Sequence, residues 1–333
     1  MTAPRPIGSF TVFPVGLGCM SLSHAYGAPP PPADGAKLIA CAVERGVTHF
    51  DTAALYGAGR NEELVGPALK PHRNNIHLAS KCGATFIDGK RIIDGRPASL
   101  RATCEAALKR LRTDVIDLYY LHRWDKSTIA IEECVGGLAA LVEQGKVRDI
   151  GLSEVSADTI RRAHAVHPIA AVQSEYSLWT RNAEVAVLET CRAIGAAYVA
   201  FSPLGRGFLA GGVTSPAELL DKDIRKPMPR FQEPHFARNL KLVAGLEAIA
   251  REAGCTKAQL CLAWLLAKAD HIVPIPGTTS LAHLEEDVAA ANVTLSADVV
   301  SRLEALINPS TVSGPRYPAA IQAEIDTEEL ETA

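Results

Sequence analysis

The feature that most constrains the fold of this 333-residue chain is a regular alternation of short apolar segments with amphipathic helical patterns. The apolar segments are nearly continuous, as in Ile116–Leu121, which is typical of parallel strands that are covered on both faces. Strands are predicted over residues 15–20, 47–51, 76–80, 115–121, 148–152, 170–174, 197–202 and 271–275.

Eight strands that alternate with helices predict an α/β fold of the (β/α)8 type, a TIM barrel, as a single domain over residues 1–333. A doubly wound parallel sheet is the alternative. The alternation is interrupted by a long loop over residues 203–238, which is rich in Gly, Pro and charged residues. The last segment, residues 308–333, is expected to be a tail with little regular pattern.

The composition argues against several classes of partner. The net charge is -3 and no basic stripe is present, so nucleic acid is not an expected partner. No apolar stretch approaches the roughly 20 residues that span a bilayer, and no secretory signal is recognised, so no membrane association is expected. The 8 cysteines form no Cys-x-x-Cys pair and no zinc-ligand spacing, which predicts no metal and a reducing, cytoplasmic setting.

Polar residues follow three successive predicted strands where each strand ends. Asp51 ends the second strand and Tyr56 follows it in a loop, Lys81 ends the third strand, and His122 ends the fourth. Singly, each has an ordinary interpretation as a cap, a rim side chain or a loop cation. Because the carboxyl ends of barrel strands meet at one mouth, the four together predict a catalytic site.

The chemistry of these four residue types suits the reduction of a carbonyl group. A free tyrosine has a pKa of about 10, and a neighbouring lysine ammonium is expected to lower the pKa of Tyr56. Asp51 can hold Lys81 in place, and His122 can hydrogen-bond a substrate carbonyl. Such a site protonates the carbonyl oxygen while hydride arrives at the carbonyl carbon.

A hydride donor of the nicotinamide type needs a site for its phosphates. The string Gly205, Gly207 and Ala210 has Gly-x-Gly-x-x-Ala spacing, but it does not open a regular βαβ helix, and we do not interpret it as a Rossmann motif. Instead, the segment 202–207 is predicted to wrap a pyrophosphate, and the segment 275–280 leads into a helix whose N-terminus favours an anion. Both segments follow the seventh and eighth strands, where barrels often bind phosphate.

Several segments, in order along almost the whole chain, resemble the aldo-keto reductase family. They are Gly-Leu-Gly-Cys-Met at 16–20, Phe-Asp-Thr-Ala-Ala-Leu-Tyr-Gly at 50–57, Ala-Ser-Lys-Cys-Gly at 79–83, Asp-Leu-Tyr-Tyr-Leu-His at 117–122, Gly-Leu-Ser at 151–153, Val-Gln-Ser-Glu-Tyr-Ser at 172–177, Phe-Ser-Pro-Leu-Gly at 201–205 and Ile-Pro-Gly-Thr at 275–278. The likeness is to the bacterial and plant branch with pyridoxal-reductase-like members.

This resemblance implies NADPH-dependent reduction of aldehydes or ketones to alcohols, with Tyr56 as the proton donor and Asp51, Lys81 and His122 in support. The cofactor-binding residues that it implies, together with two residues of the first strand, are Gly18, Met20, Ser153, Glu154, Gln173, Phe201, Ser202, Pro203, Leu204, Gly205, Arg206, Gly207, Gly277, Thr278, Thr279, Ser280, His283, Glu286 and Asp287. The substrate is expected against Trp124, Tyr26 and Phe231.

The chain departs from the family pattern in two respects. Glu154 stands where many members have an Asn that contacts the nicotinamide carboxamide, and Gly277 and His283 stand where a Lys and an Arg usually meet the 2′-phosphate. The resemblance implies NADP as the coenzyme, the substitutions at Gly277 and His283 weaken that expectation, and NAD is the alternative.

The expected partner is a small-molecule carbonyl compound, such as an aromatic aldehyde or a vitamer like pyridoxal, and the chain is expected as a monomer or a homo-oligomer. Two rival functions are compatible with the sequence. One is a coenzyme-binding, redox-sensing regulatory subunit with slow turnover, and the other is a barrel isomerase that uses Lys81 as a Schiff base.

Overall fold

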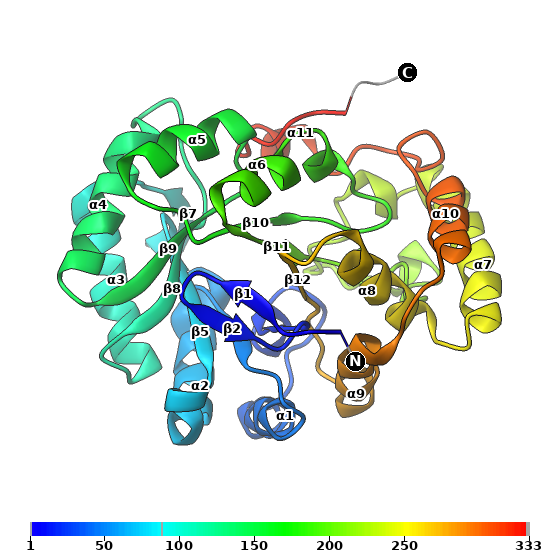
Figure 1. Cartoon of the computed structure of the whole chain (residues 1–333), viewed down its shortest axis with the longest axis horizontal. Coiled ribbons are helices and arrows are strands. Elements are labelled where there is room, and N and C mark those ends of the chain that lie inside the picture. The colour runs from blue at the N-terminus through cyan, green and yellow to red at the C-terminus, as the bar shows by residue number, and fades with distance from the viewer. Residues whose placement is uncertain (1, 88, 331–333) are drawn as a thin grey trace.

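A computed structural model describes residues 2–87 and 89–330. Its central sheet contains eight parallel strands in the order β12-β11-β10-β9-β8-β5-β4-β3 (Figure 1). Each barrel strand therefore pairs with the barrel strands that come before and after it along the chain. The strands are β3 (Leu17–Gly18), β4 (His49–Asp51), β5 (His77–Cys82), β8 (Ile116–Leu121), β9 (Val147–Ser153), β10 (Ala171–Glu175), β11 (Ala197–Phe201) and β12 (Ile272–Ile275).

The first and last strands of this sheet meet and close it into a barrel. The N–H of Gly16 donates to Pro274 O at 2.9 Å, and the N–H of Gly18 donates to Pro276 O at 2.9 Å. A Cβ at Gly18 would lie 2.9 Å from Ile275 O, so the close approach of the two chains requires glycine here. The predicted (β/α)8 barrel is therefore confirmed, and closure excludes the doubly wound alternative.

Helices surround the barrel (Figure 1), and most of them contribute buried residues to a hydrophobic cluster shared with the strands. In α3, Leu100 and Cys104 are fully buried at a spacing of one helical turn, as the periodicity predicts. Thr256 and Gln259 form a reciprocal capping box that starts α8. The helices are α1 (Pro32–Glu44), α2 (Arg60–Leu69), α3 (Pro97–Leu111), α4 (Ile131–Glu143), α5 (Ala157–Val166), α6 (Val187–Ile194), α7 (His235–Glu252), α8 (Lys257–Lys268), α9 (Leu281–Ala289), α10 (Ala297–Leu306) and α11 (Ala319–Gln322).

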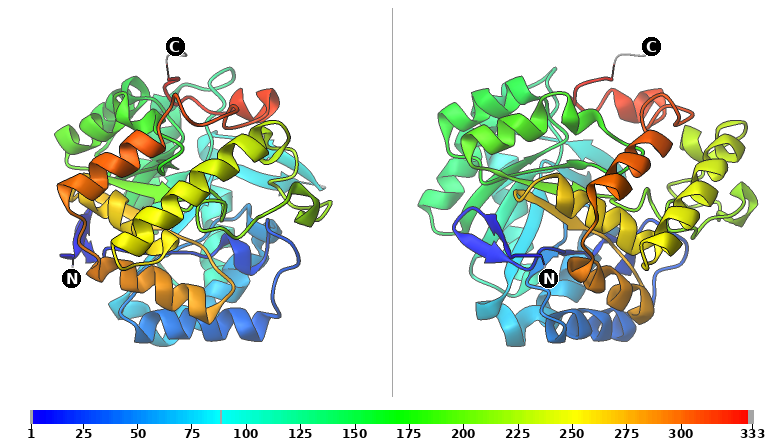
Figure 2. Two further views of the ribbon diagram at one scale, coloured as in Figure 1. Left: turned by 90° about the vertical axis from the view of Figure 1, so that its right-hand side faces the viewer. Right: turned by 45° about the vertical axis from the view of Figure 1, so that its right-hand side comes forward.

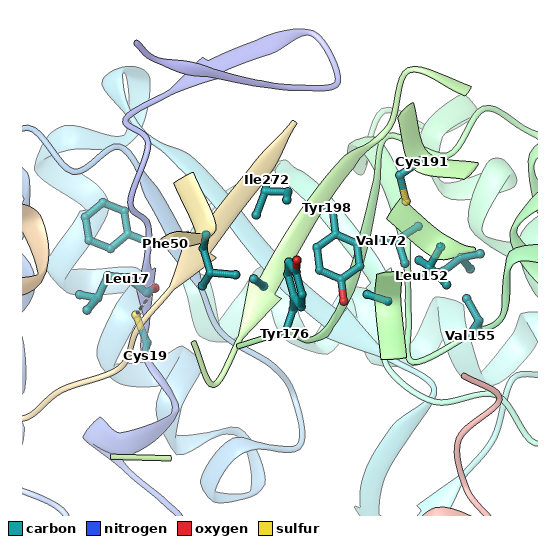
Figure 3. Packing of buried hydrophobic residues seen from close by; sticks show 14 of the residues in the cluster. Leu17, Cys19, Phe50, Leu152, Val155, Val172, Tyr176, Cys191, Tyr198 and Ile272 are labelled. Carbon is teal, nitrogen blue, oxygen red and sulfur yellow. Dashed lines mark hydrogen bonds between the residues drawn. The ribbon is translucent and has the colours of Figure 1, made fainter. Parts of the chain in front are cut away.

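The core lies on both sides of the strands. Outside the barrel, Tyr176 and Tyr198 pack edge to face with ring centroids 5.8 Å apart, in the cluster that Figure 3 shows between strands and helices. At the end of the barrel where the strands begin, β1 (Arg5–Ile7) and β2 (Phe10–Val12) form a two-stranded hairpin. The hairpin adds Ile7 and Val12 to a second buried cluster, which is made of strand residues. This hairpin therefore closes the amino-terminal opening of the barrel.

Three additions to the barrel lie around the carboxyl ends of its strands. An antiparallel hairpin of β6 (Ala84–Ile87) and β7 (Lys90–Ile93) follows β5 and was not predicted. The long loop after β11 contains only short 3-10 turns at 216–218 and 229–231. The segment 308–330, whose later part is red in Figure 2, is not a loose tail, because Asp326 accepts hydrogen bonds at the start of α5 and Glu324 pairs with Arg91.

Candidate active site

The four residues predicted at the strand ends come together at one mouth of the barrel. The buried Lys81 ammonium donates to Asp51 Oδ1, to Thr52 O at 2.9 Å and to Tyr56 Oη at 3.2 Å. The rings of Tyr56 and His122 lie edge to face, with centroids 5.8 Å apart and an interplanar angle of 87°. The geometry expected from the sequence, a phenol in contact with an ammonium, is present.

Lys81 remains a cation despite complete burial. Burial alone lowers the pKa of Lys81, but Asp51 and Tyr56 outweigh it, and the pKa of Lys81 is raised above its usual value. The second carboxylate oxygen of Asp51, Oδ2, accepts from Gln173 Nε2 at 2.8 Å. Oδ1 of Asp51 thus holds the lysine, as expected from the sequence, while Gln173 holds Oδ2.

The balance of effects on Tyr56 differs from the sequence expectation. Burial and, to a smaller extent, the Asp51 carboxylate raise the pKa of Tyr56, while Lys81 and, more weakly, Arg123 lower it, and the net pKa is above the usual value. Desolvation of the phenolate, which residue spacing does not reveal, outweighs the effect of the nearby ammonium. Tyr56 therefore keeps its proton across the neutral pH range and is available as an acid.

His122 is neutral in this site. Burial and the nearby cations Arg123, Lys81 and Arg91 hold the pKa of His122 well below its usual value. Its Nδ1 is buried and has no hydrogen-bond partner among the described residues. A neutral imidazole beside the phenol can donate one hydrogen bond to a carbonyl oxygen without adding charge.

One long cavity of about 740 Å³ connects this cluster to the loops after β11 and β12. Tyr56, Asp51 and His122 line it, and Lys81 lies beneath them. The other sequence-predicted residues that line it are Gly18, Met20, Tyr26, Ser153, Gln173, Phe201, Ser202, Pro203, Leu204, Arg206, Gly207, Gly277, Thr278, Thr279, His283, Glu286 and Asp287.

Three residues expected to bind coenzyme are not in the cavity lining. Glu154 is held by Arg316, whose Nη2 lies 2.7 Å from both Glu154 carboxylate oxygens. Ser280 uses its hydroxyl to accept from the N–H of His283 as the N-cap of α9. The α-carbon of Gly205 faces the Trp179 ring, where a Cβ would come within 2.8 Å of the indole.

Two residues expected to contact substrate are also not in the lining. The indole N–H of Trp124 donates to Ile129 O at 2.8 Å within its own loop. Phe231 is 2% exposed and packs edge to face against Trp179 and Phe208. Trp124 and Phe231 therefore make local packing contacts and are not part of the cavity wall. Tyr26 does line the cavity, with the Arg225 guanidinium 4.8 Å from its ring centroid.

The turn at 202–207 is built from left-handed backbone, with φ of 50° at Ser202, 59° at Arg206 and 85° at Gly207. The N–H groups of Gly205 and Gly207 donate to carbonyls within the turn, so these two amides do not point to a ligand. Arg206 pairs with Glu175 at 2.7 Å and donates to Tyr317 Oη at 3.0 Å, so its charge is already compensated. The turn therefore offers a shaped surface rather than a free cation.

The far end of the cavity carries hydroxyls and acids. Thr278 and Thr279 follow β12, and His283 lies one turn into α9, whose N-terminus opens toward the cavity. Asp287 lies on the next turn of the same helix, and burial, with a smaller contribution from Glu286, raises its pKa to about 8. Its Oδ1 has no partner among the described residues.

Several lining residues were not anticipated from the sequence. Arg123 and Arg225 line the cavity, and Tyr317 and Ile321 reach it from the C-terminal segment. The signal for Arg123 was available, because it directly follows His122 at a strand end. Tyr317 and Ile321 lie in a segment without periodicity, and no local pattern points to them.

Among the described residues, no group of three or more metal-ligating side chains is present, and no helix is long and apolar enough to cross a membrane. All 8 cysteines are free thiols.

Comparison with known proteins is consistent with this geometry. The family model described as "Aldo/keto reductase family" matches residues 14–308. A curated protein of Glycine max, "Probable aldo-keto reductase 1", is 46% identical over 313 residues, covering 92% of this chain and 89% of the relative.

Two solved structures extend the comparison to the fold. A glycerol dehydrogenase from Gluconobacter oxydans is 27% identical with a TM-score of 0.85, covering 96% of this chain and 98% of that one. An aldo/keto reductase from Klebsiella pneumoniae in complex with NADP and acetate is 25% identical with a TM-score of 0.73, covering 95% and 99%. The chain therefore belongs to the aldo/keto reductase family and is an NAD(P)H-dependent oxidoreductase.

Proposed function

We propose that this protein reduces aldehydes or ketones to alcohols with NADPH as the hydride donor and Tyr56 as the proton donor. The observation that carries the proposal is the Tyr56 hydroxyl, 3.2 Å from a buried ammonium and at the edge of the long cavity. NADPH is supported by the NADP complex of the Klebsiella pneumoniae relative.

The residues along the cavity fit such a coenzyme. Ser153 and Gln173 offer a hydroxyl and an amide close to Tyr56, where a carboxamide would be held, and Phe201 offers an aromatic face for the ring. The turn at 202–207 and the segment 277–287 would hold the pyrophosphate and adenosine. When bound, the coenzyme supplies hydride to the carbonyl carbon.

The chain's own residues handle the proton. As the carbonyl carbon gains hydride, its oxygen becomes basic and takes the phenolic proton of Tyr56. The resulting phenolate is stabilised by the Lys81 ammonium, which Asp51 keeps charged and oriented. Solvent then returns a proton to Tyr56. A raised pKa does not prevent this step, because an alkoxide is a far stronger base than a phenolate.

The structure argues against the Schiff-base alternative for Lys81. Its ammonium is fully buried, raised in pKa, and engaged by three oxygens, whereas a Schiff-base lysine must be neutral and reach the substrate. The regulatory-subunit alternative is disfavoured by the complete set of Asp51, Tyr56, Lys81 and His122.

A Tyr56→Phe variant tests the proposal beside a panel of aldehydes. We expect it to lose roughly 100-fold or more in kcat while binding NADPH as the unaltered protein does, measured by quenching of protein fluorescence. Tyr119→Phe is the matched control, because it removes a buried hydroxyl that has no hydrogen-bond partner in the described part of the chain and lies outside the cavity lining. Undiminished turnover by the Tyr56 variant would overturn the assignment.

A further inference from the structure

Arg123 is a cavity-lining cation that the proposed proton-transfer step does not use. It follows His122 directly at the carboxyl end of β8, and it is half-buried at the cavity wall. It is close enough to lower the pKa of both Tyr56 and His122. Its guanidinium therefore lies at the reactive end of the cavity.

The hydrogen bonds of Arg123 leave most of its donors unused. Nη1 donates to His122 O at 2.5 Å and to Ser153 Oγ at 3.3 Å, and both acceptors are uncharged. Nε is buried without a partner among the described residues. A guanidinium has five N–H donors in a planar fork, so the Nε and Nη2 edge has no acceptor within the described protein.

The contrast with the other two arginines of the cavity is sharp. Arg206 pairs with Glu175 at 2.7 Å, and Arg225 pairs with Asp223 at 2.7 Å. For Arg123, no carboxylate among the described residues lies within 4 Å, and the Asp51 carboxylate of the catalytic cluster is bound by Lys81 and Gln173. A partly desolvated guanidinium without a counter-charge is unfavourable unless a ligand provides one.

We propose that Arg123 binds a carboxylate of the substrate, so that the preferred substrates are aldehydes or ketones carrying a carboxylate close to the carbonyl group. This inference rests on the proposed reductase function. One uncompensated positive charge matches the single charge of a carboxylate, and the fork of Arg pairs with its two oxygens. The Arg123 site thus adds an orientation constraint to the carbonyl binding by Tyr56 and His122.

The test compares each acid with its own methyl ester, which has the same carbonyl but no charge. We would measure kcat/KM at pH 7.5 for 2-, 3- and 4-carboxybenzaldehyde and succinic semialdehyde and for the corresponding esters. The acid-to-ester ratio is expected to exceed one for the unaltered protein. It is expected to fall about tenfold or more in Arg123→Met and to be partly retained in Arg123→Lys.

Lys126→Met is the matched control for a general effect of charge. Lys126 also lies on the loop after β8 and pairs with Asp326, but it is 55% exposed and does not line the cavity. We expect it to change the acid-to-ester ratio by less than about twofold, because exposed charges are screened by solvent. An equal effect of both variants would show long-range steering and overturn the Arg123 site.

Binding measurements separate failure of this inference from failure of the proposed function. Calorimetry with 4-(hydroxymethyl)benzoate on the NADPH-bound protein reports the carboxylate site without turnover. Binding that is lost in Arg123→Met supports the site even if no aldehyde is reduced. Two results would overturn the carboxylate site. One is reduction of acids and esters with equal efficiency. The other is weaker NADPH binding in Arg123→Met that slows the reduction of acids and esters alike.

Discussion

Replacement of Arg316 by Met is expected to release the C-terminal segment from the barrel. Arg316 connects this segment to two buried acids. It pairs with both oxygens of Glu154 at 2.7 Å and with Glu175 at 3.1 Å. The side chains of Glu154 and Glu175 are 0% and 3% exposed. Methionine keeps the length of the side chain, so the change removes charge rather than bulk.

The size of the effect follows from the two carboxylates left behind. Breaking a buried ion pair by removing one partner costs about 3–5 kcal/mol. The pKa of Glu175 gives a similar scale. Burial alone raises it, but Arg206 and Arg316 lower it to about 2 from the ordinary 4.5. That difference corresponds to about 3 kcal/mol of net attraction, shared among the neighbouring arginines.

The cost is relieved if the segment detaches and water reaches the acids, so local opening is the expected response. The amide of Asp326, which donates to Glu154 O at 2.9 Å, reports this opening by hydrogen exchange. We expect exchange of peptides covering residues 313–330 to become roughly 100-fold faster in Arg316→Met, with α8 unaffected. Arg192→Met, which breaks the exposed pair with Glu189, is the control and is expected to change nothing measurable.

The pH dependence of this effect has a defined sign. In the unaltered protein Glu175 stays ionised down to a pH of about 2. In the variant its folded pKa rises, so the carboxyl becomes neutral as pH falls, and the penalty for burying it declines. The exchange ratio should therefore be largest at neutral pH and shrink below about pH 5. A change of less than threefold at neutral pH, or a ratio that is independent of pH, would refute this reasoning.

Two further predictions concern histidines. His283→Ala should weaken NADPH binding by about fivefold or more and leave NADH binding unchanged, because only NADPH carries a 2′-phosphate that would contact His283. Fluorescence titrations with the two coenzymes measure this, and equal losses of affinity would contradict the prediction. His49 and His77 share an Nδ1 to Nδ1 contact of 2.9 Å, and burial lowers the pKa of His49 to about 4 and that of His77 as well. The unfolded chain therefore binds more protons below about pH 6.5, and stability should fall by about 2 kcal/mol from His49 alone by pH 5. Urea denaturation should show this slope, and the double change His49→Gln with His77→Gln should flatten it.

The sequence predicted the parts of this molecule that depend on local periodicity. Continuous apolar strands and amphipathic helices follow from side-chain burial on both faces of a parallel sheet, and the structure confirms the eight strands. The meeting of Asp51, Tyr56, Lys81 and His122 also followed, because barrel topology brings successive strand ends to one mouth. The rule that the carboxyl ends of barrel strands face one mouth was enough to place these four residues together.

Features that depend on pairing between distant segments were not predictable in this way. The sequence indicated that Glu154 replaces an amide, but its partner Arg316 lies 162 positions later in a segment without periodicity. The net pKa of Tyr56 depends on how fully the surrounding loops desolvate it, which no spacing rule conveys. The β6–β7 hairpin was missed because its strands lie outside the barrel alternation.

The substitution at position 154 and the course of the C-terminal segment are two aspects of one arrangement. A carboxylate at this strand end would cost free energy if it were buried without a counter-charge. Glu154 has left-handed backbone, with φ of 58°. Its side chain does not line the cavity, and Arg316 neutralises its charge. Tyr317, which follows Arg316 directly in the chain, and Ile321 line the cavity. A Glu154→Asn change alone would therefore leave Arg316 with half its counter-charge and loosen the cavity wall, so the family's usual residue is expected to be unfavourable here.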